Sequence, residues 1–184
     1  MAKVNRLTIL FLLVFVVALG ALFVTSSSVS AKAEINYVST VEIRNGANGY
    51  LYGNNDEYKE DDSLQDVFDE IVANATSVVK VSFVNVTTTE ALEFDYERKI
   101  VLESGVVNYN GTINDTFITV KGGWLEMQGA QIYADVACAL KIESSAKLTM
   151  YSGSLTTSGA IIGKMQSTLH NEGECFIAGG IITY

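Results

Sequence analysis

The sequence predicts an all-β protein built as a β-solenoid of about four coils, with a helix capping its N-terminal end. Two observations predict this fold. Four nine-residue segments repeat the same apolar and small positions without gaps, at offsets of 25, 23 and 27 residues. One amphipathic helical segment precedes them, and after it the apolar residues recur with a period of two. Repeats of this length are typical of solenoids, propellers and arrays.

The composition limits the possible functions. The chain has 184 residues, a net charge of -9 and no proline, and 48% of its residues are hydrophobic. This apolar content is enough for a core and too high for a disordered chain. The negative charge argues against a nucleic-acid partner.

Residues 1–33 have the order of a secretory signal peptide. Two basic residues precede the uncharged run Leu7–Val24, and small residues with cleavage sites after Ala31 or Ala33 follow. The alternative is an uncleaved membrane anchor, because eighteen apolar residues are just enough to span a bilayer. Both readings predict a secreted or cell-surface protein, and it contacts a membrane only if the signal is retained.

A polar lead-in segment, residues 34–62, comes next. Its sequence EINYVSTVEI alternates like a strand, and its Asn-Gly pairs favour turns. The acidic run Asp56–Asp62 lacks the ligand spacing of a helix-loop-helix calcium site. We therefore predict a solvated loop there and no metal site.

Residues 63–184 form the predicted solenoid, with the capping helix at about residues 63–75. Asp62 and Ser63 are suitable N-cap residues. The apolar residues of the helix share one face, at the spacing of an amphipathic helix: Leu64, Val67, Phe68, Ile71 and Val72. The β-branched segment Val78–Val86 then predicts a strand.

The four repeats are Lys99–Val107, Trp124–Ile132, Lys147–Leu155 and Glu174–Ile182. Positions two, four and nine of each are apolar or cysteine, and positions six and seven are small. A further strand is predicted before three of the repeats, at residues 117–120 and 139–142 and, with a weaker pattern, at 167–171. Each unit therefore predicts short strands joined by a small-residue corner, with apolar side chains stacked inside. An antiparallel sandwich would explain the alternation but not the repeat.

The segments LTMYSGSL and CFIAGGII resemble the coils of secreted right-handed parallel β-helix proteins of the pectin-lyase-like superfold. The helix and the first coil resemble the N-terminal part of such proteins, so that the resemblance covers about residues 60–184. It implies a right-handed parallel β-helix. The last coil is also similar to the Gly-Gly-apolar repeats of polymorphic outer-membrane adhesins, although their Phe-x-x-Asn repeat is absent.

The resemblance also implies where chemistry would lie, because enzymes of this superfold use clustered Asp residues beside a basic residue on one outer face. No such cluster can be transferred to this chain. Glu103 and Glu126 point outward and could lie close together, with no basic residue aligned with them, and an outward Trp124 could stack on a sugar ring. These three are the candidate ligand-binding residues, and we expect no catalytic residue, metal or cofactor.

The remaining candidates carry little chemistry. His170 is expected in a surface turn. Cys175 takes an inward core position and Cys138 lies on another strand, so we expect no disulfide between them. Four asparagines stand in glycosylation sequons, whose use depends on the source of the protein: Asn74, Asn85, Asn110 and Asn114.

These patterns together favour an exported, non-enzymatic protein that serves surface adhesion or carbohydrate binding. One alternative is the remnant of a polysaccharide lyase or glycoside hydrolase. Another is the N-terminal part of a longer repeat adhesin.

The last repeat predicts self-association. Its inward positions, Cys175, Ile177 and Ile182, continue the apolar columns and are followed by no further coil in this sequence. An uncovered coil presents apolar side chains and a free strand edge, which favour pairing with another chain. We expect light scattering to show association of the purified protein, and a stable monomer at high concentration would contradict this.

Overall fold

The computed structural model describes residues 40–54, 56–75, 78–111, 116–136, 138–158 and 167–183. All of these belong to one compact unit, Ile35–Tyr184. The predicted signal segment, residues 1–33, and the sequon residue Asn114 lie outside the described residues. Within the described ranges, no helix is both long and apolar enough to cross a membrane.

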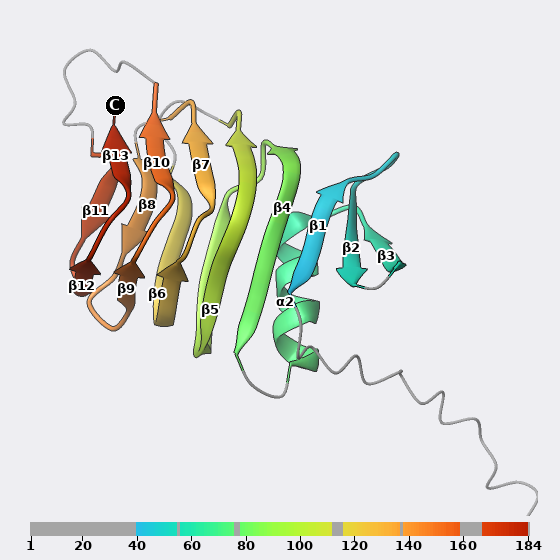
Figure 1. The fold of residues 1–184 in the computed structure, drawn as a ribbon, viewed down its shortest axis with the longest axis horizontal. Coiled ribbons are helices and arrows are strands. Elements are labelled where there is room, and N and C mark those ends of the chain that lie inside the picture. Colours follow the sequence, from blue (N-terminus) through green and yellow to red (C-terminus); the bar gives the residue numbers. More distant parts are fainter. Residues whose placement is uncertain are drawn as a thin grey trace, which may run out of the picture. The chain divides into compact units, whose positions relative to one another are not determined.

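Thirteen strands and one helix make up the described part of the chain (Figure 1). In chain order they are β1 (Val41–Asn45), β2 (Tyr50–Asn54), β3 (Glu57–Asp61), α2 (Leu64–Asn74), β4 (Val79–Thr88), β5 (Leu92–Tyr109), β6 (Thr116–Met127), β7 (Gln131–Ala134), β8 (Cys138–Ile142), β9 (Lys147–Met150), β10 (Ser154–Thr157), β11 (Leu169–Asn171), β12 (Glu174–Ile177) and β13 (Ile181–Thr183).

The strands from β4 onward wind into coils with three faces. Face 1 contains the start of β5, the start of β6, β8 and β11. Face 2 contains the start of β4, the middle of β5, the end of β6, β9 and β12. Face 3 contains the ends of β4 and β5, followed by β7, β10 and β13. Every pairing between successive coils is parallel, which confirms the predicted β-solenoid of about four coils.

The observed register reproduces the sequence repeat residue by residue. On face 2, Ile100 pairs with Leu125, Leu125 with Leu148, and Leu148 with Cys175. On face 3, a second inward column pairs residues of position nine in the same way: Val107, Ile132, Leu155 and Ile182. The structure also adds a coil before the first repeat, since Val79 of β4 pairs with Ile100. The sequence pattern had identified β4 only as a strand.

The corner between faces 2 and 3 requires glycine in most coils. Gly105 has φ +89°, and a Cβ atom there would lie 1.6 Å from the backbone oxygen of Phe83 in the preceding coil. Gly153 and Gly180 occupy the equivalent corners and also have positive φ. Side chains other than glycine rarely adopt this conformation, and the close approach of two coils leaves no space for one.

Helix α2 packs against the first coils, as the predicted cap should. Ser63 is its N-cap and accepts a hydrogen bond from the backbone N–H of Asp66 at 3.2 Å. The five residues predicted to share its apolar face are all buried. The Phe68 ring lies 4.8 Å from the ring of Phe94, centroid to centroid. The helix therefore contributes aromatic packing to the core at this end of the solenoid.

The same helix also closes a free strand edge. The first strand of face 1 has no described strand on its N-terminal side, and Gln65 lies there instead. The Gln65 amide donates to the carbonyl oxygen of Glu93 at 3.0 Å and accepts from its N–H at 2.8 Å. This amide thus makes the two hydrogen bonds that a neighbouring strand would make. In return, Glu90 accepts hydrogen bonds from the backbone N–H groups of Leu64 and Gln65 at the start of the helix.

The polar lead-in segment is more ordered than its sequence indicates. β1 pairs in parallel with β4, and β2 and β3 extend this sheet as antiparallel strands. The acidic run predicted as a loop is therefore largely the strand β3, because its residues pair with β2. Charged side chains on such an outer strand discourage pairing with other chains.

The last repeat is exposed in both of its strands, β12 and β13. Cys175 was predicted to be core, but it is exposed even though it occupies the inward column. Ile177 and Ile182 in the same coil are 47% and 39% exposed. The reason is that each coil buries its inward side chains against the next, and the described residues place none beyond this one. Both cysteines are free, as predicted.

Gly105→Ala should destabilise the protein by more than about 2 kcal/mol, because the new methyl group meets backbone and the positive φ is strained. Gly122→Ala is the matched control, since its Cβ would meet only the movable carboxylate of Asp95 at 2.9 Å. We expect the control to change stability by less than about 1 kcal/mol in chemical denaturation. Equal effects of the two variants would contradict the corner geometry.

Candidate functional site

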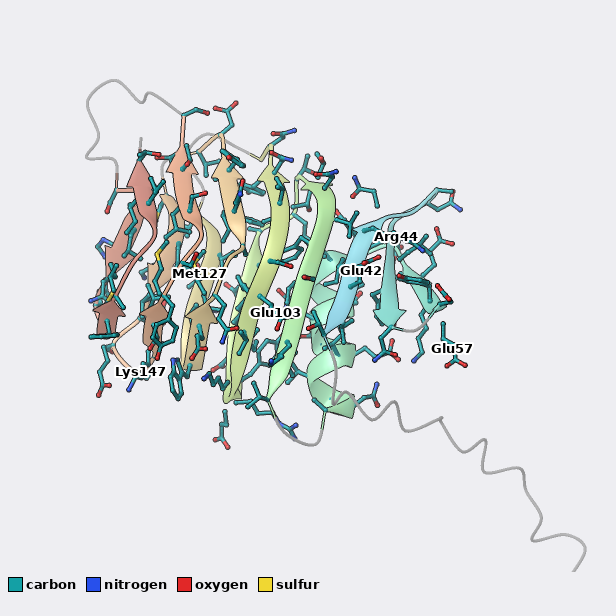
Figure 2. All side chains as sticks on the ribbon, in the orientation of Figure 1. Glu42, Arg44, Glu57, Glu103, Met127 and Lys147 are labelled. Atoms are coloured by element: carbon teal, nitrogen blue, oxygen red, sulfur yellow. The ribbon has the colours of Figure 1, made fainter. Side chains whose placement is uncertain are left out.

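The residues singled out by the sequence lie on the outer side of face 2. β-strands alternate their side chains, so the residues between the inward columns point outward. The register forms two outward columns there. The first contains Lys99, Trp124, Lys147 and Glu174, and the second contains Lys80, Val101, Glu126, Thr149 and Phe176. Figure 2 labels Glu103 and Lys147, which both belong to this face.

Trp124 is half-buried between two lysines of the neighbouring coils. The ammonium nitrogen of Lys99 lies 4.1 Å from the centroid of the indole ring, and that of Lys147 lies 5.0 Å from it. The indole N–H donates to the hydroxyl of Thr149 at 3.0 Å. Cation–π contacts of this kind hold the ring in place. They support a role for Trp124 in joining three coils, and contact with a sugar at this ring stays a prediction.

Glu126 is buried although it points outward. Its carboxylate forms an ion pair with Lys99 and accepts a hydrogen bond from the side-chain amide of Gln128 at 2.6 Å. Burial raises the pKa of the Glu126 carboxyl, but the bonds from Lys99 and Gln128, with the charges of Lys99 and Lys80, lower it more. The net pKa lies below the usual range of a glutamate, so this side chain is ionised at neutral pH.

Glu103 lies one coil earlier, at an irregularity where β4 and β5 shift register. Its carboxylate is 3.4 Å from the ammonium nitrogen of Lys80 and also accepts a hydrogen bond from the hydroxyl of Thr40. No basic residue stands at the equivalent positions of the four repeats, but each of the two glutamates has a lysine partner. Lys99 and Lys80 reach them from neighbouring positions, because a lysine side chain is long enough to cross between coils.

The charges on face 2 are paired within the face. Glu126, Glu103 and Glu174 each form an ion pair with a different lysine. A general acid or base needs a pKa near the working pH and access to a substrate. Glu126 has neither, because it is ionised and buried against Lys99. The arrangement supports cohesion between coils more than catalysis.

The other titratable candidates also give no indication of a catalytic or metal site. His170 is exposed, as predicted, but lies in strand β11 rather than in a turn, 3.0 Å from a carboxylate oxygen of Glu172. Burial raises the pKa of the Cys138 thiol, which disfavours a reactive thiolate. Asp61, Asp62 and Asp66 could bring three carboxylate oxygens within 4.8 Å of one another at the start of α2. Two of them are exposed, and clusters of this kind are usually solvated.

A recess of about 470 Å³ lies between α2 and face 1. Its side chains bond mainly to one another. Gln65 donates to Asp69 at 3.0 Å, the Tyr96 hydroxyl donates to Asp69 at 2.5 Å, and Lys121 donates to Glu93 at 2.6 Å. The bonds from Tyr96 to Asp69 and from Gln65 to Glu93 attach the helix to the solenoid, so the recess is explained by the cap.

Face 3 carries a smaller hollow that sequence reasoning missed. It has a volume of about 240 Å³ and spans β5, β7 and β10. Its lining is polar except for one alanine and the ring of Tyr133, which is 42% exposed: Asn108, Asn110, Tyr133, Ala134, Asp135, Thr156 and Ser158. The sequence contains a pattern that could have indicated this hollow: the outward residues of the third strand of each coil are uncharged, apart from Asp135.

No family model matches the chain, and neither the curated proteins nor the solved structures contain a significant match.

Glu126→Gln should cost about 1–3 kcal/mol of stability at pH 7, because Lys99 loses its partner in a partly buried site. The folded-state pKa of Glu126 is lowered, so its contribution is present above the unfolded value, near 4.3, and is lost as the pH falls through the folded pKa. The difference in the free energy of unfolding between the parent protein and Glu126→Gln, measured by chemical denaturation, should therefore vanish in acid.

The matched control for this prediction is Glu172→Gln, which removes an exposed carboxylate beside His170. Exposed pairs contribute little, so we expect a change below about 0.5 kcal/mol. An equal loss in both variants, or a Glu126→Gln deficit that persists in acid, would contradict the ion-pair assignment.

Proposed function

We propose that this chain is an exported, non-enzymatic β-helix protein that binds a carbohydrate or another cell-surface ligand on the outside of its solenoid. The observation that carries the proposal is the outer side of face 3, where a polar hollow surrounds an exposed tyrosine. Surface sites for ligands combine an aromatic or apolar contact with a few polar groups that fix orientation. On this face both are accessible to solvent.

The state of Glu126 supports binding over catalysis. The paired carboxylates of glycoside hydrolysis need distinct protonation states and a defined separation. Glu126 is held ionised by Lys99, and Glu103 forms its own ion pair with Lys80. Neither carboxylate is free to move a proton at a substrate.

Export rests on the sequence of residues 1–33, with its basic start, apolar run and small-residue cleavage sites. The proposed location is the cell surface or the medium. The intact mass of the secreted protein tests it: cleavage after Ala31 or Ala33 is expected, and retention of the whole segment would indicate an anchor.

As part of the proposal, we place this solenoid in the pectin-lyase-like superfold. The alternative functions follow from that resemblance. The chain would then be the remnant of a polysaccharide lyase or hydrolase, or the N-terminal part of a longer repeat adhesin. Release of new chain ends from polygalacturonate that is lost in Glu126→Gln would favour the enzyme.

We expect the purified protein to bind a subset of immobilised oligosaccharides without shortening any of them. The measurement is an array of neutral and acidic oligosaccharides, read first for bound protein and then for released chain ends. Trp124→Ala is included as a test of face 2, with its thermal stability measured in parallel. Absence of binding to every glycan, or turnover of one, would contradict the proposed function.

A further inference from the structure

The hollow on face 3 is formed by equivalent positions of three successive coils. Asn108 of β5 pairs with Tyr133 of β7, and Tyr133 pairs with Thr156 of β10. The next outward positions, one residue beyond the ends of the same strands, are Asn110, Asp135 and Ser158. Neighbouring strands lie about 4.8 Å apart, so these two columns run side by side along the solenoid axis.

Tyr133 stands above the smaller side chains that flank it. Asn108 and Thr156, its neighbours in the column, are both shorter, and the tyrosine is 42% exposed. Its hydroxyl donates to Gln131 two residues earlier, at 3.2 Å. The ring is therefore anchored at one end and offers an apolar surface beside the hollow. Such a ring can pack against the C–H face of a sugar.

The polar groups around the ring have free hydrogen-bonding capacity. Among the described residues, none bonds to the side-chain amide of Asn108 or of Asn110, and each amide offers donors and an acceptor. Asp135 accepts one hydrogen bond, from the hydroxyl of Ser158 at 3.0 Å. An ionised carboxylate accepts several hydrogen bonds, so Asp135 retains capacity for the hydroxyl groups of a ligand.

The charge of the site selects among glycans. Asp135 is the one charged residue in the lining of the hollow. The outward positions of face 3 in the described strands contain no lysine or arginine, whereas face 2 has three lysines in ion pairs. A carboxylated or sulfated sugar would bring negative charge next to Asp135 with no compensating cation. Like charges in such proximity oppose binding.

We propose that this hollow is a binding site for a neutral glycan with adjacent hydroxyl groups, lying along the solenoid axis. The sugar stacks on Tyr133, and its hydroxyls donate to Asp135 and exchange hydrogen bonds with the two asparagine amides. The inference rests on the proposed function and adds to it both the site and the class of sugar.

The test uses the full secreted protein and two sets of immobilised probes: neutral gluco-, manno-, galacto- and xylo-oligosaccharides, and acidic oligogalacturonates and sialylated oligosaccharides. Binding to members of the neutral set is expected. In Tyr133→Ala we expect a loss of about tenfold or more for those probes, because the stacking surface is removed. Asp135→Asn should weaken neutral binding by a smaller factor, since the amide oxygen still accepts hydrogen bonds.

Tyr151→Ala is the matched control. Tyr151 is also exposed, at 51%, but lies at the corner after β9, outside the lining of the hollow. The Tyr151→Ala variant should bind the neutral probes as the parent protein does, and circular dichroism should show that all three variants are folded.

The outcomes separate this inference from the proposed function. Glycan binding that is confined to the acidic probes, or neutral binding that survives Tyr133→Ala, overturns the assigned sugar class or site and leaves a glycan-binding protein. Absence of binding to every probe overturns the proposed function together with this inference.

Discussion

The structure depends on one constraint: each strand of a coil can satisfy its backbone only by pairing in parallel with the equivalent strand of the next coil. A one-residue slip would turn every inward side chain outward. The register is therefore fixed by the buried columns, such as Ile100, Leu125 and Leu148 on face 2. The corners must match as well, and there the approach of Gly105 to the backbone of the preceding coil leaves no space for a side chain. The inward columns on face 2 thus contain apolar residues or cysteine in every described coil, whereas the outward positions vary in charge and polarity.

The same constraint leaves the first strand of each face with unpaired backbone groups along its free edge. On face 2 these groups pair with β1, and the charged strands β2 and β3 continue the sheet beyond it. Face 1 has no such strand among the residues that the structure describes. There the amide of Gln65 bonds to both backbone groups of Glu93, while Glu90 bonds to the first N–H groups of α2. Helix and strand thus satisfy each other's unpaired groups, and for this reason the helix is an integral part of the solenoid.

The sequence allowed the inward structure to be predicted closely and the outward structure poorly. Inward columns obey a single rule, so aligning the four repeats gave the true pairing partners, and the helical spacing of the apolar residues gave the five buried residues of α2. Outward contacts obey no repeat. Lys99 reaches Glu126 diagonally, from a different position of the alignment, and a search along equivalent positions did not find it. β2 and β3 were missed because polar, glycine-rich segments form strands only when a sheet edge is available for pairing. Cys175 fits the core pattern, but its burial depends on a further coil rather than on its own position.

The two outer faces show how one scaffold can separate stability from recognition. On face 2, long charged side chains pair across coils and enclose Trp124, so that the polar groups of this face bond mainly to one another. On face 3, Ser158 bonds to Asp135 and Thr156 to Thr183 across neighbouring coils, but no described residue bonds to the side-chain amides of Asn108 and Asn110. A ligand can form hydrogen bonds to unpaired groups beside an exposed ring, whereas a group that is already paired must first lose its partner. In a solenoid, the face that contributes least to holding the coils together is therefore the face best suited to bind.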